Sequence, residues 1–248
     1  MYMITCAART GSSLLETSLL SHPDIMSHGE VYNPNRIGSL RGRHSQILKN
    51  EAQCTALTEY RDSNQTAFLY KYVYDAQGKT QVGLKLKHEE LIMSKFAETR
   101  EAIRRDTDIK IIHLRRINLF ERFVSWWMAA KVTGVTEIHS ETDRPEVTAV
   151  TIPIALCREN FDQVSARYAF FKIMFKDHPI YEVAYEDLAG PRREMVFAEI
   201  QDFLKVAPHP LQSRLQKVNV KKMRDIIANY DALKKAFSDT PYSAFFTE

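Results

Sequence analysis

The chain has 248 residues, of which 44% are hydrophobic and 26% are charged, and its formal net charge is +3 at pH 7. This composition is typical of a globular protein and excludes a disordered or fibrous one. The charge is too evenly balanced for a protein that coats nucleic acid or a membrane through its net charge, although a local anion site remains compatible with it.

The cysteines and the N-terminus indicate a cytoplasmic protein. Cys6, Cys54 and Cys157 lie far apart and form no CxxC pair, which disfavours a disulfide framework and a zinc site. The longest nearly apolar stretches, residues 123–130 and 149–157, are shorter than the ~20 residues of a membrane-spanning helix. The N-terminus shows no basic region followed by an apolar core, so we expect no signal peptide and a soluble cytoplasmic protein.

Short β-like runs alternate with helical patterns along the chain. Strands are predicted at residues 2–6, 82–87, 110–115 and 180–185. Apolar residues recur at helical spacing in residues 161–175, 195–204 and 223–233. This alternation predicts an α/β fold, in which a central parallel sheet is flanked by helices and binds its ligand beyond the carboxyl ends of the strands.

Two polar stretches interrupt the pattern, at about residues 33–78 and 132–153. We interpret them as insertions within a single domain spanning residues 1–248, because neither shows the periodicity of an independent core. Insertions beside a site often shape what enters it.

The segment after the first strand has the features of an anion-binding loop. Gly11 permits close backbone approach, and Ser12 and Ser13 fall in the first turn of the next helix. The free N–H groups of that turn and the positive helix end attract anions. Arg9, just before Thr10, adds a cation capable of forked contacts with phosphate or sulfate oxygens. The alternative explanation is an ordinary strand followed by a capped helix.

This loop differs from the Walker A loop of nucleotide-hydrolysing proteins. Alignment with G-x-x-x-x-G-K-[ST] places Cys6 at the first glycine, Gly11 at the second and Ser12 at the lysine. The lysine that grips phosphate is absent, and the cation lies upstream at Arg9. A nucleotide kinase or NTPase with a degenerate phosphate loop is therefore a disfavoured alternative.

A second basic cluster ends the strand predicted at residues 110–115. Arg116 directly follows Arg115, and Ser125 lies nine residues later, about two and a half helical turns away. Whether Arg116 and Ser125 can grip one group depends on the turn between them, which spacing alone does not settle. Surface charge beyond a strand is the alternative explanation for the arginines.

With both clusters in view, the chain resembles the sulfotransferases that use 3′-phosphoadenosine 5′-phosphosulfate (PAPS). It is most similar to the bacterial carbohydrate branch, that of the Nod-factor and trehalose sulfotransferases. The family's R-[ST]-G-[ST]-[ST] loop, which holds the 5′-phosphosulfate, matches the run from Arg9 to Ser13. Its second motif, an arginine and a helical serine that hold the 3′-phosphate, matches Arg116 and Ser125.

Shorter matches extend the resemblance over most of the chain. They are a Gly-Glu segment at Glu30, a Gly-x-Lys-Leu strand at Lys85, a Tyr-Glu-Asp-Leu strand end at residues 185–188, and a Lys-x-Asn segment at Lys217. Two departures are mild: Ile117-Asn118 replaces the usual Asp-Pro, and Val218 replaces the usual Gln. The two insertions have no clear counterpart, so the resemblance says least about the acceptor.

The resemblance implies in-line transfer of the sulfuryl group from PAPS to an acceptor hydroxyl, which we expect on a carbohydrate or glycolipid. Arg9 and the loop amides would neutralise the leaving 5′-phosphate and Lys85 would support the transferring group, so no metal is expected. Glu30 is the expected base, with burial raising the pKa of its carboxyl, and His28 and then His88 are the next choices.

Lys217 is expected to fold over the donor nucleotide as a gate. A non-enzymatic alternative stays open, in which the fold is kept but only binds an anionic glycan or nucleotide. Tyrosines of the first insertion, such as Tyr60, Tyr70, Tyr72 and Tyr74, could stack on sugars or merely pack. The oligomeric state is left open by the sequence.

Overall fold

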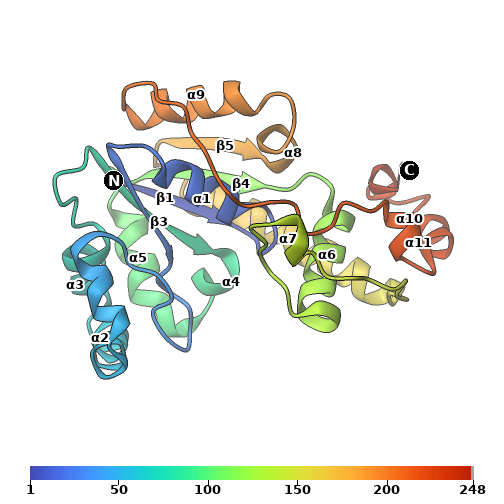
Figure 1. The fold of residues 1–248 in the computed structure, drawn as a ribbon, viewed down its shortest axis with the longest axis horizontal. Helices are drawn as coiled ribbons and strands as arrows, with labels where there is room; N and C mark the ends of the chain where they lie inside the picture. Colours follow the sequence, from blue (N-terminus) through green and yellow to red (C-terminus); the bar gives the residue numbers. More distant parts are fainter. Residues whose placement is uncertain (247–248) are drawn as a thin grey trace. The chain divides into compact units, whose positions relative to one another are not determined.

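The computed structural model describes residues 1–246 and is drawn as a ribbon in Figure 1. Within it the chain divides into two compact units. Unit 1 consists of Met1–Arg115 and Tyr168–Ser213, and unit 2 consists of Arg116–Arg167 and Arg214–Glu248. The expectation of a single domain over residues 1–248 stays a prediction.

Unit 1 contains a five-stranded parallel sheet with the strand order β2-β3-β1-β4-β5. The strands are β1 (Tyr2–Cys6), β2 (Ile25–Glu30), β3 (Gln81–Lys87), β4 (Lys110–Arg115) and β5 (Ile180–Ala184). The predicted parallel sheet is confirmed, as are the four predicted strands. Because β1 lies between β3 and β4, all five of its residues are buried, as a central parallel strand requires.

The strand β2 was not predicted. Its sequence is Ile-Met-Ser-His-Gly-Glu, and the polar residues Ser27 and His28 hide the apolar run that marks a buried strand. Both side chains are nevertheless fully buried, because β2 pairs with β3 and is covered on its two faces.

Helices cover both faces of the sheet in unit 1. They are α1 (Ser12–Leu20), α2 (Glu51–Ser63), α3 (Gln65–Phe68), α4 (His88–Leu91), α5 (Ala97–Arg105), α8 (Tyr185–Leu188) and α9 (Arg193–Leu204), with the 3₁₀ segments η1 (Gly42–Lys49) and η3 (Ser94–Phe96) and the π-helical segment η2 (Leu69–Val73). The confirmed helix α9 runs beside β5 at the top of Figure 1.

Each face of the sheet has its own apolar core. On one face, Tyr2 and Ile4 of β1 pack with Leu15 of α1 and with apolar residues of α9. On the other face, Met3 and Leu84 pack with residues of α3, α5 and the end of α7 (Ile154–Met174). This division follows the alternation of side chains along each strand.

The first insertion, residues 33–78, folds as η1, α2, α3 and η2 within unit 1. Its tyrosines contact other side chains of the insertion and its neighbours, although Tyr70 is exposed. The ring of Tyr72 stacks on Phe68, 5.5 Å away, and also contacts Tyr60. Tyr74 is buried, and the Tyr70 hydroxyl donates a hydrogen bond to Asp106.

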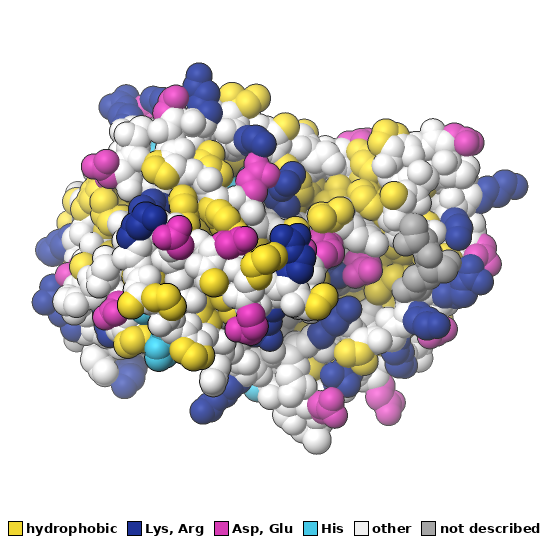
Figure 2. Space-filling model, turned by 90° about the horizontal axis from the view of Figure 1, so that it is seen from above, with side chains coloured by type: hydrophobic (Ala, Val, Ile, Leu, Met, Phe, Trp, Pro, Cys, Tyr) yellow, Lys and Arg dark blue, Asp and Glu magenta, His cyan; other side chains and the backbone are white. Residues whose placement is uncertain are grey.

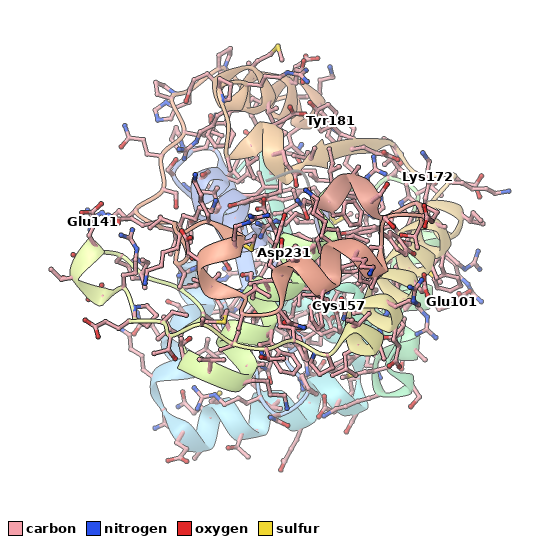
Figure 3. The ribbon with its side chains drawn as sticks, turned by 90° about the vertical axis from the view of Figure 1, so that its right-hand side faces the viewer. Glu101, Glu141, Cys157, Lys172, Tyr181 and Asp231 are labelled. Atoms are coloured by element: carbon pink, nitrogen blue, oxygen red, sulfur yellow. The ribbon has the colours of Figure 1, made fainter. Side chains whose placement is uncertain are left out.

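Unit 2 is mainly helical. Its elements are α6 (Leu119–Trp127), η4 (Met128–Thr133), η5 (Glu141–Asp143), α10 (Met223–Ile226), α11 (Tyr230–Ala236), η6 (Ser243–Phe245) and the first part of α7 (Ile154–Met174), which continues into unit 1. The buried Cys157, labelled in Figure 3, lies on α7. The helical pattern predicted over residues 223–233 is interrupted, because the backbone around Ile227 pairs with Val150 instead of continuing the helix.

The surface carries both signs of charge. Figure 2 shows Lys and Arg side chains interspersed with Asp and Glu side chains over the face that it presents. This mixing agrees with the net charge of +3. Among the helices of residues 1–246, none is both long and apolar enough to cross a bilayer.

Candidate functional site

The loop between β1 and α1 curls through two left-handed residues. The backbone φ is 68° at Arg9 and 84° at Gly11. Such residues turn neighbouring N–H groups toward one side, which creates a concave nest for an anion. At Arg9 this conformation costs about 1–2 kcal/mol, so the surrounding structure must hold it.

The same loop leads directly into the first turn of α1. The buried Thr10 hydroxyl donates to the carbonyl oxygen of Ala7 at 2.8 Å and fixes the turn from inside. Gly11 is the N-cap residue of α1. Glycine has no side-chain oxygen to offer the first amides of the helix, and the first turn holds no acidic residue. The N–H groups around Ser12 and Ser13 therefore keep the capacity to bind an anion.

Glycine is also required at position 11 because of its contact with Tyr185. A Cβ at this position would lie 2.4 Å from Cδ2 of Tyr185, the first residue of α8. The tyrosine ring thus packs directly against the loop, and any side chain at position 11 would displace the ring or the loop.

Lys85 brings a buried ammonium to the loop from the neighbouring strand. It lies on β3 opposite Ile4 of β1 and is only 4% exposed. Its Nζ donates a hydrogen bond to Oγ of Ser13 at 3.1 Å. The cation that the loop lacks at Ser12 is therefore supplied by β3. A buried ammonium needs polar partners, and Oε1 of Glu30 lies 3.7 Å away as a second one.

A β-bulge decides where Glu30 points. His28 pairs with Leu84 and Glu30 pairs with Lys85, so Gly29 is an extra residue in β2. This extra residue reverses the alternation of side chains, so Glu30 and His28 lie on opposite faces of the sheet. Glu30 joins the face of Lys85.

Glu30 is held by two lysines. Its Oε1 lies 3.0 Å from Nζ of Lys87 and 3.7 Å from Nζ of Lys85. Burial raises the pKa of the Glu30 carboxyl, but the attraction of Lys85 and Lys87 outweighs burial and leaves the pKa below its usual value. The expected rise of this pKa is therefore not found. The side chain is 40% exposed, so Glu30 is an ionised and reachable carboxylate at neutral pH.

The two histidines considered as bases lie on the other face of the sheet. His28 is fully buried, its Nδ1 accepts a hydrogen bond from the backbone N–H of Arg41 at 2.9 Å, and burial lowers its pKa to about 4. His88 is also buried, and its ring stacks on Phe171 at 4.5 Å and lies 5.5 Å from His113. The structure thus brings Glu30, rather than His28 or His88, to Lys85.

Charged residues at the end of β3 were missed by the sequence analysis. Lys87 lies two residues after Lys85 and therefore on the same face, and its Nζ is 3.1 Å from Oε1 of Glu90. Glu89 accepts a hydrogen bond from the backbone N–H of Ala8, in the loop, at 3.2 Å. The period-two repeat of lysines in a predicted strand was the signal that could have revealed Lys87.

In unit 2, the turn before α6 brings Arg116 onto that helix. Nη2 of Arg116, which is 7% exposed, lies 2.6 Å from Oε2 of Glu121. Asn118 caps α6 by accepting a hydrogen bond from the N–H of Glu121 at 3.0 Å. Ser125 lies four residues after Glu121, one turn along the same helix face. The structure thus places Arg116 against Glu121, one turn before Ser125 on the same helix, and the joint grip of Arg116 and Ser125 on one group stays a prediction.

Lys217 lies in the irregular segment between α9 and α10 and is exposed. The preceding residue, Gln216, forms an isolated backbone bridge with Ile138 within unit 2. The expected gating role of Lys217 stays a prediction. Over residues 1–246, no group of three or more His, Cys, Asp or Glu side chains is arranged to hold a metal ion.

Comparison with known proteins finds relatives over the whole chain, although no family model matches it. Nodulation protein H of Rhizobium tropici is 25% identical over 253 residues, which cover 99% of this chain and 92% of that protein. Nodulation protein H of Rhizobium meliloti strain 1021 is 24% identical over 249 residues, which cover 99% of this chain and 94% of that protein.

Solved structures show the same fold. A sulfotransferase from Alicyclobacillus acidocaldarius has a TM-score of 0.50 at 17% identity, with 99% of this chain and 93% of that chain covered. The sulfotransferase domain from the curacin biosynthetic pathway has a TM-score of 0.54 at 16% identity, with 99% and 94% covered. The expected sulfotransferase fold is therefore confirmed.

Proposed function

We propose that this chain, a sulfotransferase by its fold and its whole-length similarity to relatives, transfers the sulfuryl group of PAPS to a carbohydrate or glycolipid hydroxyl. One observation carries the proposal: an anion-binding turn, a buried lysine and an ionised carboxylate meet within unit 1. Lys85 contacts Ser13 of the turn at 3.1 Å and Glu30 at 3.7 Å. These are the groups that sulfuryl transfer needs at its donor, its leaving group and its acceptor.

The loop is the proposed site of the 5′-phosphosulfate. The left-handed Arg9 supports this assignment, because its backbone conformation has a cost that an anion site explains. Gly11 lets the loop take a second left-handed φ without that cost. In the reaction, the acceptor oxygen attacks sulfur as the bond from sulfur to the 5′-phosphate oxygen breaks. Negative charge then grows on the leaving adenosine 3′,5′-bisphosphate, and Lys85 and Arg9 stabilise it.

Glu30 is the proposed general base. The proton of the acceptor hydroxyl moves to its carboxylate, which is ionised because Lys85 and Lys87 lower its pKa. A carboxylate of lowered pKa is a weak base toward a free alcohol. The attacking hydroxyl becomes more acidic as its oxygen bonds to sulfur, however, so the proton transfers late in the reaction.

Arg116 and Ser125 are the proposed partners of the 3′-phosphate, and Lys217 is proposed to close over the nucleotide. The contact of Arg116 with Glu121 at the start of α6, one turn before Ser125 on the same helix, supports the first assignment. A 3′-phosphate would compete with Glu121 for the Arg116 guanidinium, because both are anions.

Ligand-induced stabilisation tests the donor assignment. Adenosine 3′,5′-bisphosphate is expected to raise the unfolding temperature of the protein, whereas ATP with magnesium raises it little, because the loop lacks the Walker A lysine. Equal stabilisation by ATP with magnesium would favour a nucleotide kinase or NTPase. Stabilisation by neither ligand would contradict the proposal.

A further inference from the structure

A chain of alternating charges runs from the phosphate loop to a buried glutamate of α4. Starting at Oγ of Ser13, it passes to Nζ of Lys85, Oε1 of Glu30, Nζ of Lys87 and Oε1 of Glu90, with successive separations of 3.1, 3.7, 3.0 and 3.1 Å. We call these four charged residues the β3 ion chain. It includes Lys87, to which the proposed function gives only an effect on the pKa of Glu30, and Glu90, to which the proposed function gives no role.

The two ends of the β3 ion chain are anchored and its middle is exposed. Glu90 is 2% exposed, and while one oxygen contacts Nζ of Lys87, the other accepts a hydrogen bond from the Lys87 backbone N–H at 2.9 Å. Lys85 is fixed at the other end by Ser13. Glu30, between them, is the member that an acceptor can reach. Buried charges of this kind are stable only while their partners remain in place.

We propose that Lys87 and Glu90 are a positioning pair for the general base: Lys87 holds the Glu30 carboxylate, and Glu90 holds Lys87. This inference rests on the proposed function. As a consequence, the two lysines that share one face of β3 have different roles. Because Lys87 is the nearer cation to Glu30, Lys85 stays directed at the loop and the leaving group.

The β3 ion chain also links proton transfer to the charge of the site. Two lysines and two glutamates cancel while Glu30 is ionised. When the acceptor proton reaches Glu30, its negative charge is lost, and the chain becomes net positive beside the loop. This gain coincides with the breaking of the bond between sulfur and the 5′-phosphate oxygen, when the leaving bisphosphate becomes more negative. The attraction of Lys85 to the leaving group is then strongest when it is needed.

The experiment is a ¹³C NMR titration of the Glu30 carboxyl carbon in the full chain, assigned with Glu30→Gln. Lys87→Met removes the nearer cation, so we expect the titration midpoint to rise by about one pH unit. Glu90→Gln is expected to lower kcat at neutral pH, where Glu90 holds Lys87. It should leave the Glu30 midpoint close to the wild-type value, because burial raises the pKa of Glu90 and Glu90 is protonated before Glu30 as the pH falls. Lys87→Arg, which keeps the charge, is expected to stay close to the wild-type midpoint.

Lys205→Met is the matched control. Lys205 forms an exposed pair with Asp202, three residues away, which has the same spacing as the pair of Lys87 and Glu90. The Lys205→Met substitution should leave the midpoint of the Glu30 titration unchanged. The acid limb of kcat/KM for sulfate transfer should follow the NMR midpoints in all variants, because the base acts only when ionised.

A raised midpoint in Lys87→Met that Lys87→Arg does not reproduce distinguishes a charge effect on Glu30 from mere support of α4. An unchanged midpoint in Lys87→Met, or an unchanged kcat in Glu90→Gln, would overturn the inference. If Lys87→Met does not fold, Lys87→Gln, which also removes the charge, is titrated in its place. The titration needs neither donor nor acceptor, so a raised midpoint in a protein that transfers no sulfate would refute the proposed function while upholding the electrostatic role of Lys87.

Discussion

Gly11 allows the geometry of the loop to be tested with a single methyl group. In Gly11→Ala the new residue must keep a φ of 84°, which costs about 1–2 kcal/mol for a non-glycine residue. Its Cβ would also lie 2.4 Å from Cδ2 of Tyr185, so the ring or the loop must move. From the backbone cost and the contact with Tyr185 together, we expect a loss of about 2–4 kcal/mol in the free energy of unfolding.

Gly78→Ala separates the two contributions. Gly78 has a φ of 83°, almost the same as Gly11, but a Cβ there meets no heavy atom within 4 Å. It therefore carries only the backbone cost, and the difference between the two variants measures the contact with Tyr185. A double-mutant cycle with Tyr185→Ala should show the same coupling, because removing the ring relieves the contact at position 11.

Urea denaturation gives the free energies, and calorimetry gives the affinity for adenosine 3′,5′-bisphosphate. We expect Gly11→Ala to be less stable than Gly78→Ala and to bind the bisphosphate about tenfold more weakly or worse, while Gly78→Ala binds like the wild type. Equal destabilisation by the two substitutions would refute the packing of Tyr185 against the loop. An unchanged affinity in a distorted Gly11→Ala loop would refute the loop as the donor site.

Four further predictions concern individual side chains. Glu30→Gln should abolish sulfate transfer and leave bisphosphate affinity within about twofold, and retained turnover would place the base elsewhere. Because the pKa of Glu30 is lowered, the wild-type kcat/KM should stay constant from neutral pH down to the usual glutamate range. It should fall only as the pH drops through that lowered pKa, and a loss of kcat/KM near pH 6.5 would point to a histidine instead. Arg116→Ala should weaken the binding of the bisphosphate about tenfold more than the binding of adenosine 5′-phosphate, whereas Glu121→Gln should strengthen the binding of the bisphosphate. Equal losses of affinity for both ligands in Arg116→Ala would contradict a 3′-phosphate contact. Asn118→Ala should cost about 1 kcal/mol in urea denaturation through loss of the α6 cap, and an unchanged stability would show that the cap does not hold the turn.

The sheet could be predicted to the extent that its strands are apolar. The strands β1 and β4 are buried runs rich in Ile, Leu and Met, and the structure places both at the predicted residues. The strand β2 was not predicted because Ser27, His28 and Gly29 break its apolar run, and the burial of these residues depends on partners distant in the sequence. The interrupted helix near Ile227 has the same cause, since its helical spacing is overridden by backbone pairing with Val150.

The candidate site was predictable where a motif carries its own chemistry. The loop residues could be found because a turn and a helix start follow a predicted strand, and Lys85 could be found because its strand matches the Gly-x-Lys-Leu segment of the family that the chain resembles. The surroundings of Glu30 could not, because the bulge at Gly29 decides which face the carboxylate takes, and the neighbouring lysine and Glu90 become relevant only once that face is known. The lowered pKa of Glu30 follows from the same contacts.

Transfer of labelled sulfate from PAPS tests the central claim most directly. The wild-type chain and Glu30→Gln are incubated with labelled PAPS and a panel of glycans, glycolipids and small alcohols, and the products are separated and counted. We predict label on a carbohydrate-bearing acceptor with the wild type, together with one adenosine 3′,5′-bisphosphate released per transfer, and none above background with Glu30→Gln. Binding of the bisphosphate by the wild type without transfer to any member of the panel would contradict the claim and favour a binding module.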